Sequence, residues 1–239
     1  MATSKQRRVV IFDVGGVVTE SPIVSIRAFS EGRGLKDLNI FLGSSEAWSS
    51  LERGQIAWED FSAAVLQESK LRGFAAGESL GLEGWAELQK AVKDGGSRVR
   101  PLMVRAIQRL RKSGLKVAAL TNNFKPEAAP LALRKGMEKD QEEFRSMFDH
   151  FIESAVAGMR KPDPAFYRHA LQVIGCQPEE VVFLDDIGKN LKPAAEMGIL
   201  TIHVQNTGAD TYLEAVQRLQ EAVGVQLLDE GTGSGNSRL

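Results

Sequence analysis

The stretch from Val9 to Val18 constrains the fold more than any other part of the chain. It begins with four apolar residues, Val9–Phe12, a short continuous run of the kind that a strand buried on both faces makes. The run stops at Asp13, and Gly15 and Gly16 follow almost at once. Open α/β sheets bind ligands beyond the carboxyl ends of their strands, and glycines let the backbone approach an anion or metal closely. An ordinary strand end, with an Asp that starts a turn, is the alternative interpretation.

Length and composition favour a globular α/β chain. Its 239 residues allow one α/β domain with an insert, or two small domains. The formal net charge of −1 creates no overall field that would favour nucleic acid or a membrane surface. No apolar span of about 18 residues occurs, which argues against a membrane span and a secretory signal. The single cysteine, Cys176, has no partner for an internal disulfide, so we expect a reducing compartment.

Short apolar runs alternate with helical patterns after residue 100, which is typical of a parallel, doubly wound sheet. The predicted strands cover residues 9–13, 116–120, 151–154, 181–184 and 199–204. The predicted helices cover residues 104–111, 164–174, 189–197 and 209–223. Right-handed crossovers should connect these parallel strands.

Helical spacing and frequent glycines prevail between the first strand and residue 97, with helical segments at 23–31, 57–71 and 85–92. We therefore predict a helical cap over residues 18–95, inserted into a core formed by residues 1–17 and 96–228. The charged stretch 124–148 predicts one or two solvated helices on the flank of the sheet. Residues 229–239 have the composition of a flexible linker, so we expect a disordered tail.

Polar side chains of complementary kinds follow four of the predicted strands. They are Asp13, Thr121, Asn122, Lys161, Asp185, Asp186 and Asn190. Because the carboxyl ends of parallel strands meet at one edge, we expect these side chains in one crevice. Three acids together repel one another unless a cation is present, so Mg²⁺ with oxygen ligands is the expected occupant. Lys161 and Thr121 suit phosphate oxygens, and a carboxylate beside Mg²⁺ can attack phosphorus.

Four motifs in this order resemble those of haloacid dehalogenase superfamily hydrolases. They read Phe-Asp-Val-Gly-Gly-Val at 12–17, Leu-Thr-Asn-Asn at 120–123, Arg-Lys-Pro-Asp-Pro at 160–164 and Phe-Leu-Asp-Asp-Ile-Gly-Lys-Asn-Leu at 183–191. Each motif alone is weak, but all four in order make a strong match over about residues 8–228. The last motif, together with Leu-Glu-Arg-Gly-Gln-Ile at 51–56, most resembles the N-terminal phosphatase-like domains of soluble epoxide hydrolase and of acyl-CoA dehydrogenase family member ten. The resemblance implies a Rossmann-like α/β core with a helical cap.

The resemblance also implies a metal site and a nucleophile. By this likeness Asp13 is the nucleophile and a Mg²⁺ ligand, and the backbone carbonyl of Gly15 is a second ligand. Asp186 would be the third ligand, with Asp185 in the outer shell or bridging through water. On residue type alone, the Asp185–Asp186 pair is also compatible with capping the helix that follows it.

The remaining motif residues would bind the substrate or support the metal. Thr121 and the Asn122 N–H would hold phosphate oxygens, together with the backbone at Gly16. Lys161 would balance the charges of the nucleophile and the phosphate, and Asn190 would support the Asp pair or metal-bound water. Taken singly, Lys161 could be a surface residue and Asn190 a plain helix residue.

One departure from the family pattern concerns Gly15. Family phosphatases usually carry a second Asp at this position, two residues after the nucleophile, which protonates the leaving group and then activates water. General acid–base catalysis is typically worth about 10²–10⁴-fold, so its loss predicts slow turnover of alkyl phosphates. Acyl or anomeric phosphates, which have good leaving groups, would suffer less. The dehalogenase branch has an aromatic residue here, which the chain also lacks.

The sequence thus predicts a Mg²⁺-dependent phosphatase that acts on a small or lipid-like phosphomonoester through an aspartyl-phosphate at Asp13. A catalytically weak binding or regulatory module that uses the same pocket is the main alternative, because Gly15 replaces the general acid. Carbon–halogen hydrolysis is a third possibility, and Asp185 and Asp186 argue against it because they favour a metal. We expect no nucleic-acid partner.

The last three residues, Ser237, Arg238 and Leu239, resemble the Ser-Lys-Leu peroxisomal address, with Arg in place of Lys. They follow a flexible stretch that a peroxisomal import receptor could read. A chance tripeptide is the alternative interpretation. The sequence therefore predicts a cytoplasmic or peroxisomal location.

Overall fold

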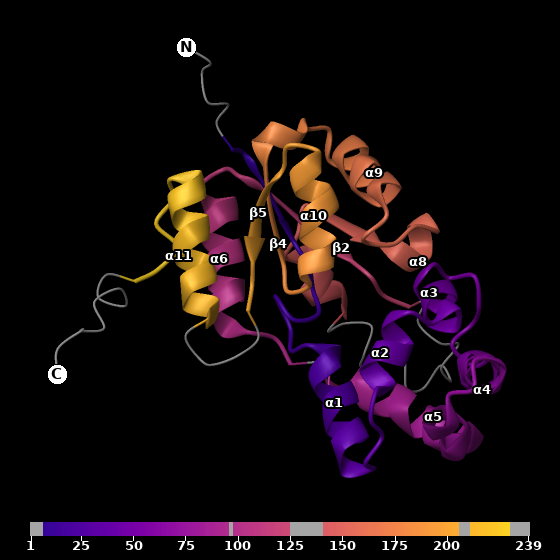
Figure 1. The fold of residues 1–239 in the computed structure, drawn as a ribbon. Helices are drawn as coiled ribbons and strands as arrows, with labels where there is room; N and C mark the ends of the chain where they lie inside the picture. The colour runs from indigo at the N-terminus through magenta and orange to yellow at the C-terminus, as the bar shows by residue number, and fades with distance from the viewer. Residues whose placement is uncertain (1–6, 96–97, 125–140, 206–210, 230–239) are drawn as a thin grey trace, which may run out of the picture.

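A five-stranded parallel sheet forms the centre of the computed structural model, which describes residues 7–95, 98–124, 141–205 and 211–229. Its strands are β1 (Val9–Phe12), β2 (Lys116–Thr121), β3 (His150–Glu153), β4 (Val181–Asp185) and β5 (Leu200–His203). They lie in the order β3-β2-β1-β4-β5 (Figure 1). Because β1 is flanked by β2 on one side and β4 on the other, the strand order reverses at β1. Ligands of open α/β sheets bind beside such a reversal, at the carboxyl ends of the strands.

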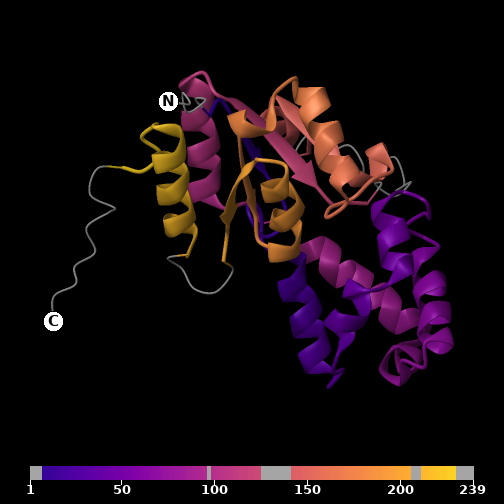
Figure 2. The ribbon, with the colours of Figure 1, turned by 45° about the horizontal axis from the view of Figure 1, so that its top comes forward.

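Two layers of helices cover the faces of the sheet (Figures 1 and 2). They are α6 (Pro101–Lys112) and α11 (Thr211–Val223) on one face, and α9 (Pro164–Ile174) and α10 (Gly188–Glu196) on the other. Val10 and Phe12 pack toward α6 and α11, whereas Val9 and Ile11 pack toward α9 and α10. Successive side chains of a strand point to opposite faces, so a strand covered on both faces is apolar throughout. This covering explains the continuous apolar run of β1.

Within the described residues, helices are the only regular elements between residues 22 and 95, a segment which we call the insert. They are α1 (Pro22–Gly32), α2 (Leu38–Gly43), α3 (Glu46–Glu52), α4 (Phe61–Leu71) and α5 (Ala75–Gly95). The insert has its own apolar core, in which Trp85, Phe61 and Leu88 are fully buried. The Trp85 indole N–H donates to the Gly77 carbonyl at 3.0 Å. The insert lies beyond one end of the sheet (Figures 1 and 2).

The two linkers between core and insert pair with each other. Thr19 and Val99 form an isolated antiparallel bridge. The Glu20 N–H donates to the Arg98 carbonyl at 2.9 Å, and the Arg100 N–H donates to the Val18 carbonyl at 2.8 Å. This pairing holds the two linkers beside each other, close to the loop that follows β1. The division into a core and a cap at 17/18 and 95/96 stays a prediction.

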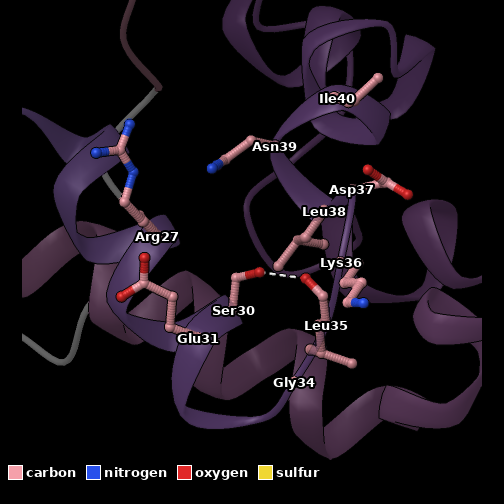
Figure 3. Close-up of a pocket in the computed structure, with 10 residues that line it drawn as sticks. All are labelled: Arg27, Ser30, Glu31, Gly34, Leu35, Lys36, Asp37, Leu38, Asn39 and Ile40. Carbon is pink, nitrogen blue, oxygen red and sulfur yellow. Dashed lines mark hydrogen bonds between the residues drawn. The ribbon is translucent and has the colours of Figure 1, made fainter.

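A cavity of about 360 Å³ lies in the insert around α1 and the start of α2 (Figure 3). Charged and polar side chains line it, among them Arg27, Glu31 and Lys36. The Ser30 hydroxyl donates to the Leu35 carbonyl and closes the turn between the two helices. None of the site residues predicted from the sequence lines this cavity, so it is separate from the predicted crevice.

The observed elements confirm the predicted α/β rhythm, and most differ only at their ends. The helix predicted at 85–92 is longer, because α5 begins at Ala75 and continues past the non-helical backbone of Gly81. The helix predicted at 57–71 begins only at Phe61, because residues 58–60 form a turn in which the Phe61 N–H donates to the Trp58 carbonyl. Ser154 begins the short α8 (Ser154–Ala157) and does not end β3. The short α2, α3, α8 and the 3₁₀ turn η1 (Pro178–Glu180) were not predicted, since such short segments show no periodicity.

Several predictions fall partly or wholly outside the described residues. They concern most of the solvated helices at 124–148, nearly all of the tail at 229–239, and the tripeptide Ser237, Arg238 and Leu239. Recognition by a peroxisomal import receptor therefore stays a prediction. Among the described helices, none combines the length and apolarity needed to cross a bilayer.

Burial predicts how the protein responds to one substitution made at two places. Leu110 on α6 is fully buried in the core, whereas the Leu71 side chain on α4 is 80% exposed. Leu110→Ala should lower the free energy of unfolding by about 2–5 kcal/mol, because it removes packed atoms and leaves a cavity. Leu71→Ala should change it by less than about 0.5 kcal/mol. Urea denaturation followed by circular dichroism measures both, and equal losses would contradict the assigned core.

Candidate active site

Asp13 lies at the carboxyl end of the central strand and is buried. Its backbone N–H donates to the Leu184 carbonyl of β4 at 2.8 Å, which extends the sheet pairing by one residue. One carboxylate oxygen, Oδ1, accepts the Val14 N–H at 2.7 Å and contacts the Lys161 ammonium at 2.9 Å. Within the described part of the chain, no protein group donates to Oδ2. Among the described residues, the Asp13 carboxylate is therefore held through Oδ1 alone.

The Lys161 ammonium lies between two carboxylates and is almost completely buried, with 1% of the side chain exposed. Its Nζ is 2.9 Å from Asp13 Oδ1 and 2.7 Å from Asp185 Oδ2. Burial alone would lower the pKa of Lys161, but the charges of Asp13 and Asp185 outweigh it and raise this pKa above the usual value. The two carboxylates therefore favour the charged form of Lys161.

Asp185, at the end of β4, is fully buried and bonded through both oxygens. Oδ1 accepts the Ile187 N–H at 2.8 Å and the Asn190 side-chain amide at 3.0 Å. Oδ2 accepts from the same amide at 3.2 Å and from Lys161. Tyr167 on α9 donates to the Asn190 carbonyl at 2.6 Å, which links α10 to its neighbouring helix. Asp185 is therefore an anchor that orients Lys161 and the turn containing Asp186.

Three carboxylates converge at the carboxyl ends of β1 and β4, where Lys161 contacts two of them. Ligand oxygens of Asp13, Asp185 and Asp186 lie within 4.8 Å of one another. Burial raises the pKa of Asp13 well above its ordinary value, Lys161 opposes this rise, and the charges of Asp185 and Asp186 add to it. One ammonium does not neutralise three acids, so the cluster favours a second cation that prefers oxygen ligands. The donor set fits Mg²⁺.

Gly16 makes room for the Asp186 carboxylate. A Cβ atom at position 16 would lie 2.2 Å from Asp186 Oδ2, and the φ angle of 89° is one that L side chains rarely adopt. The Ser21 hydroxyl donates to the same Oδ2 at 3.3 Å, and Tyr212 donates to the Gly16 carbonyl at 3.1 Å. His203 contacts the backbone carbonyl of Asp186 through Nε2 at 3.0 Å. These contacts hold the Asp186 turn against the loop that follows β1.

Gly15, the position at which the family resemblance would place a second Asp, is crowded by the first residue of the insert. A Cβ atom at Gly15 would lie 3.0 Å from Pro22 Cδ and 3.3 Å from Pro22 Cγ. An Asp at this position would therefore require Pro22 to move by a few tenths of an ångström. Pro22, at the start of α1, therefore packs closely against the backbone of Gly15.

Thr121 and Asn122, at the carboxyl end of β2, lie at the same edge of the sheet. The contacts of Asn122 could not be predicted from its position in the sequence. Thr121 is buried at the strand end. The Asn122 side chain accepts the Lys161 N–H at 2.8 Å and donates to the Lys161 carbonyl at 3.0 Å. It therefore braces both peptide groups of Lys161. The role predicted for the Asn122 N–H toward phosphate stays a prediction.

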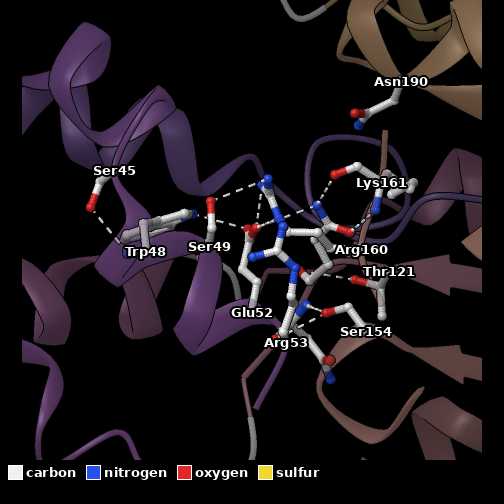
Figure 4. A network of polar contacts seen from close by, with 12 residues as sticks. Ser45, Trp48, Ser49, Glu52, Arg53, Thr121, Ser154, Arg160, Lys161 and Asn190 are labelled. Carbon is white, nitrogen blue, oxygen red and sulfur yellow. Dashed lines mark hydrogen bonds and ion pairs between the residues drawn. The ribbon is translucent and has the colours of Figure 1, made fainter. Parts of the chain in front are cut away.

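Sequence reasoning missed two charged residues that join the site to the insert. Glu52, the last residue of α3, forms a buried ion pair with Arg160, which immediately precedes Lys161 (Figure 4). Burial raises the pKa of Glu52, and the Arg160 guanidinium opposes that rise. Glu52 and Arg160 lie in motifs quoted above. The sequence does not show that they pair, because they are 108 positions apart. Ser21, which lies outside those motifs, was also missed, because its partner Asp186 is 165 positions away in the sequence.

Comparison with known proteins identifies the family. A family model described as haloacid dehalogenase-like hydrolase matches residues 7–198. The chain belongs to the haloacid dehalogenase-like hydrolases. The family assignment agrees with the parallel sheet, the order of the four motifs and the convergence of acids at the strand ends.

Relatives and fold neighbours are consistent with this assignment. Mouse (Mus musculus) acyl-CoA dehydrogenase family member 10 is 33% identical, with 92% of this chain and 19% of that protein covered. Pig (Sus scrofa) bifunctional epoxide hydrolase 2 is 41% identical over 53% of this chain and 21% of that protein. The chain thus spans about a fifth of these two relatives. A sesquiterpene phosphatase of Aspergillus oryzae is 30% identical, with 90% and 95% covered. Among solved structures, a haloacid dehalogenase family enzyme of Bacteroides thetaiotaomicron, crystallised with magnesium and inorganic phosphate, has a TM-score of 0.58 and 17% identity. The match covers 86% of this chain and 98% of that enzyme.

The contact between Gly16 and Asp186 predicts unequal effects of one substitution at two glycines. Gly34 has a comparable φ of 64°, and nothing lies near a Cβ added there. Gly34→Ala should destabilise the protein by about 1–2 kcal/mol through backbone strain alone. Gly16→Ala adds overlap with Asp186 and should destabilise it by about 2–5 kcal/mol. Urea denaturation of the two variants checks this, and equal losses would show that Asp186 does not rest on Gly16.

Proposed function

We propose that the protein is a Mg²⁺-dependent phosphatase with Asp13 as its nucleophile. The observation that carries the proposal is the state of the Asp13 carboxylate. Val14 and Lys161 hold Oδ1, while no described residue donates to Oδ2. Two further acids lie beside it, with ligand oxygens within 4.8 Å. A carboxylate fixed in this way is oriented for attack on an electrophile that arrives with a cation.

The relatives support this choice within the family. The Aspergillus oryzae relative is named a sesquiterpene phosphatase, and the Bacteroides thetaiotaomicron fold neighbour was crystallised with magnesium and inorganic phosphate. In this chain Asp13 and Asp186 would hold Mg²⁺, with the Gly15 carbonyl as a third ligand and Asp185 behind them. When bound, the ion would offset the negative charge of the phosphate and of the acids around it.

The substrate phosphate would be held by groups from three strand ends. The Thr121 hydroxyl, the Asn122 N–H and the backbone at Gly16 would donate to its oxygens, and Lys161 would supply a positive charge. The insert would act as a cap that excludes water while the phosphoryl group moves to Asp13. A small or lipid-like phosphomonoester is the proposed substrate class.

The reaction has two covalent steps. The Asp13 carboxylate attacks phosphorus, the bond between phosphorus and the ester oxygen breaks, and the leaving group departs with the bonding electrons. Water then attacks phosphorus, the bond to Asp13 breaks, and inorganic phosphate and the free carboxylate result. Since Gly15 offers no carboxyl group, the leaving group departs as an anion and takes its proton from solvent after the cap has opened.

A binding or regulatory module without turnover is the second candidate, and one observation favours it. Position 15 carries no acid, and Pro22 leaves little room for one. Such a module would still bind Mg²⁺ and inorganic phosphate in the same crevice. Measurable binding of both, without Mg²⁺-dependent phosphate release from any ester tested, would favour the module over the enzyme.

Replacement of Asp13 tests the proposed nucleophile. Asp13→Asn should lower phosphate release from an aryl phosphate by about 10³-fold or more, because the amide cannot form the covalent intermediate. Removal of Mg²⁺ with EDTA should abolish the wild-type activity, and added Mg²⁺ should restore it. Asp60→Asn, at an exposed position before α4, should leave the rate unchanged. Full activity in Asp13→Asn would refute the proposed role.

Leaving groups test the consequence of Gly15. Without a general acid, kcat/KM should fall steeply as the leaving group becomes more basic, and aryl and acyl phosphates should react about 10²–10⁴-fold faster than alkyl phosphates beyond their intrinsic reactivity difference. A series of aryl and alkyl phosphates assayed for inorganic phosphate measures this dependence. A flat dependence would mean that another group protonates the leaving oxygen.

A further inference from the structure

Glu52 carries the only ion pair between insert and core found among the described residues. Its side chain is 9% exposed and that of its partner Arg160 is 15% exposed. The Trp48 indole N–H donates to Glu52 Oε1 at 3.0 Å, and Arg160 reaches the Ser49 hydroxyl at 3.5 Å (Figure 4). The other described pairs that involve the insert's helices, such as Arg53–Glu46, join residues within it and are more exposed.

Glu52 also reaches the residue that braces Lys161. The Asn122 side-chain amide donates to Glu52 Oε2 at 3.4 Å and to the Lys161 carbonyl at 3.0 Å. Glu52 therefore contacts both segments that hold Lys161 in place, the residue before it and the side chain that brackets its peptide groups. A shift of α3 away from the core would break both contacts together.

Trp48, which donates to Glu52, also belongs to a group of aromatic contacts between insert and core. The Trp48 ring meets Phe124 edge-on, with 5.5 Å between centroids, and Trp58 meets Phe124 at 5.0 Å. Phe124 belongs to the core loop that follows Asn122, so these rings span the seam between insert and core. Because Glu52 and Arg160 are both largely buried, their attraction is stronger than it would be at the surface, and either charge alone would be costly to bury there.

We propose that Glu52 is a positioning residue, whose ion pair with Arg160 forms when the insert closes on the core and then aligns Lys161 with Asp13. This inference rests on the proposed function. Lys161 Nζ lies 2.9 Å from Asp13 and 2.7 Å from Asp185, so a small displacement of its backbone weakens both contacts. Misplacement of a catalytic group by about 1 Å can cost about 10²-fold in rate. The site is therefore assembled fully only when the insert is closed.

The test compares two glutamates of the same helix in the full chain. Glu52→Gln should lower kcat for an aryl phosphate by about 10–100-fold with little change in KM, because it disturbs alignment and removes no substrate contact. Glu46→Gln, at a side chain that is 78% exposed and 3.4 Å from Arg53, should leave kcat unchanged. Both rates are measured well below the melting temperature of each variant. Unchanged kcat in Glu52→Gln would overturn the proposal.

Hydrogen exchange provides a readout that does not depend on activity. The Lys161 N–H donates to Asn122 Oδ1, so Glu52→Gln should speed exchange in the peptide that contains Lys161 and leave the β1 peptide protected. If the wild type releases no phosphate from any ester, the proposed function fails, and faster exchange still supports the contact. Unchanged exchange in Glu52→Gln overturns the inference in either case.

Arg160→Met supplies a second route to the same conclusion, including the case in which Glu52→Gln does not fold. The single variants should lose similar activity, and Glu52→Gln/Arg160→Met should lose no more than the worse of them, because both act through one contact. Losses that multiply in the double variant would show independent roles and overturn the proposal.

Discussion

A buried ammonium group, Lys161 Nζ, determines the electrostatics of the site. It lies between the carboxylates of Asp13 and Asp185, which come from adjacent strands and would otherwise repel each other in a medium of low dielectric. Burial of a charge without a partner costs several kcal/mol, so the strand ends and Lys161 depend on one another. With Asp186 the cluster has more acidic than basic side chains, and this excess suits a divalent cation with oxygen ligands.

The rigid sheet holds one half of this arrangement, and contacts that cross the molecule hold the other. Asp13 and Asp185 end strands whose side chains are packed on both faces, so their backbones have little freedom. Lys161 belongs to no strand or helix. Its position depends on Asn122, on Arg160 and, through them, on Glu52 of the insert. Lys161 is therefore the part of the site whose position depends most directly on contacts with the insert.

The loop after β1 is a second connection between the acidic cluster and the insert. Gly16 is close to Asp186 and Gly15 is close to Pro22, so neither position has room for a side chain without a shift. The same loop leads into linkers that pair at Thr19 and Val99. The absence of a side chain at residue 15 thus goes together with the close packing of Pro22, the first residue of α1, against this loop.

The sequence by itself determined the family, the parallel sheet and the set of polar residues at the strand ends. Local signals suffice for these, because a buried strand must be apolar, a helix must be periodic and the four motifs are contiguous in sequence. Short helices such as α3 and the turn before Phe61 escaped prediction because they are too brief to show a period. Only the tertiary structure decided that Asn122 braces Lys161, that Glu52 pairs with Arg160 and that Asp186 rests on Gly16. Each of these contacts joins residues 39 to 170 positions apart, and one sequence contains no local pattern that specifies which distant charges will meet after the chain has folded.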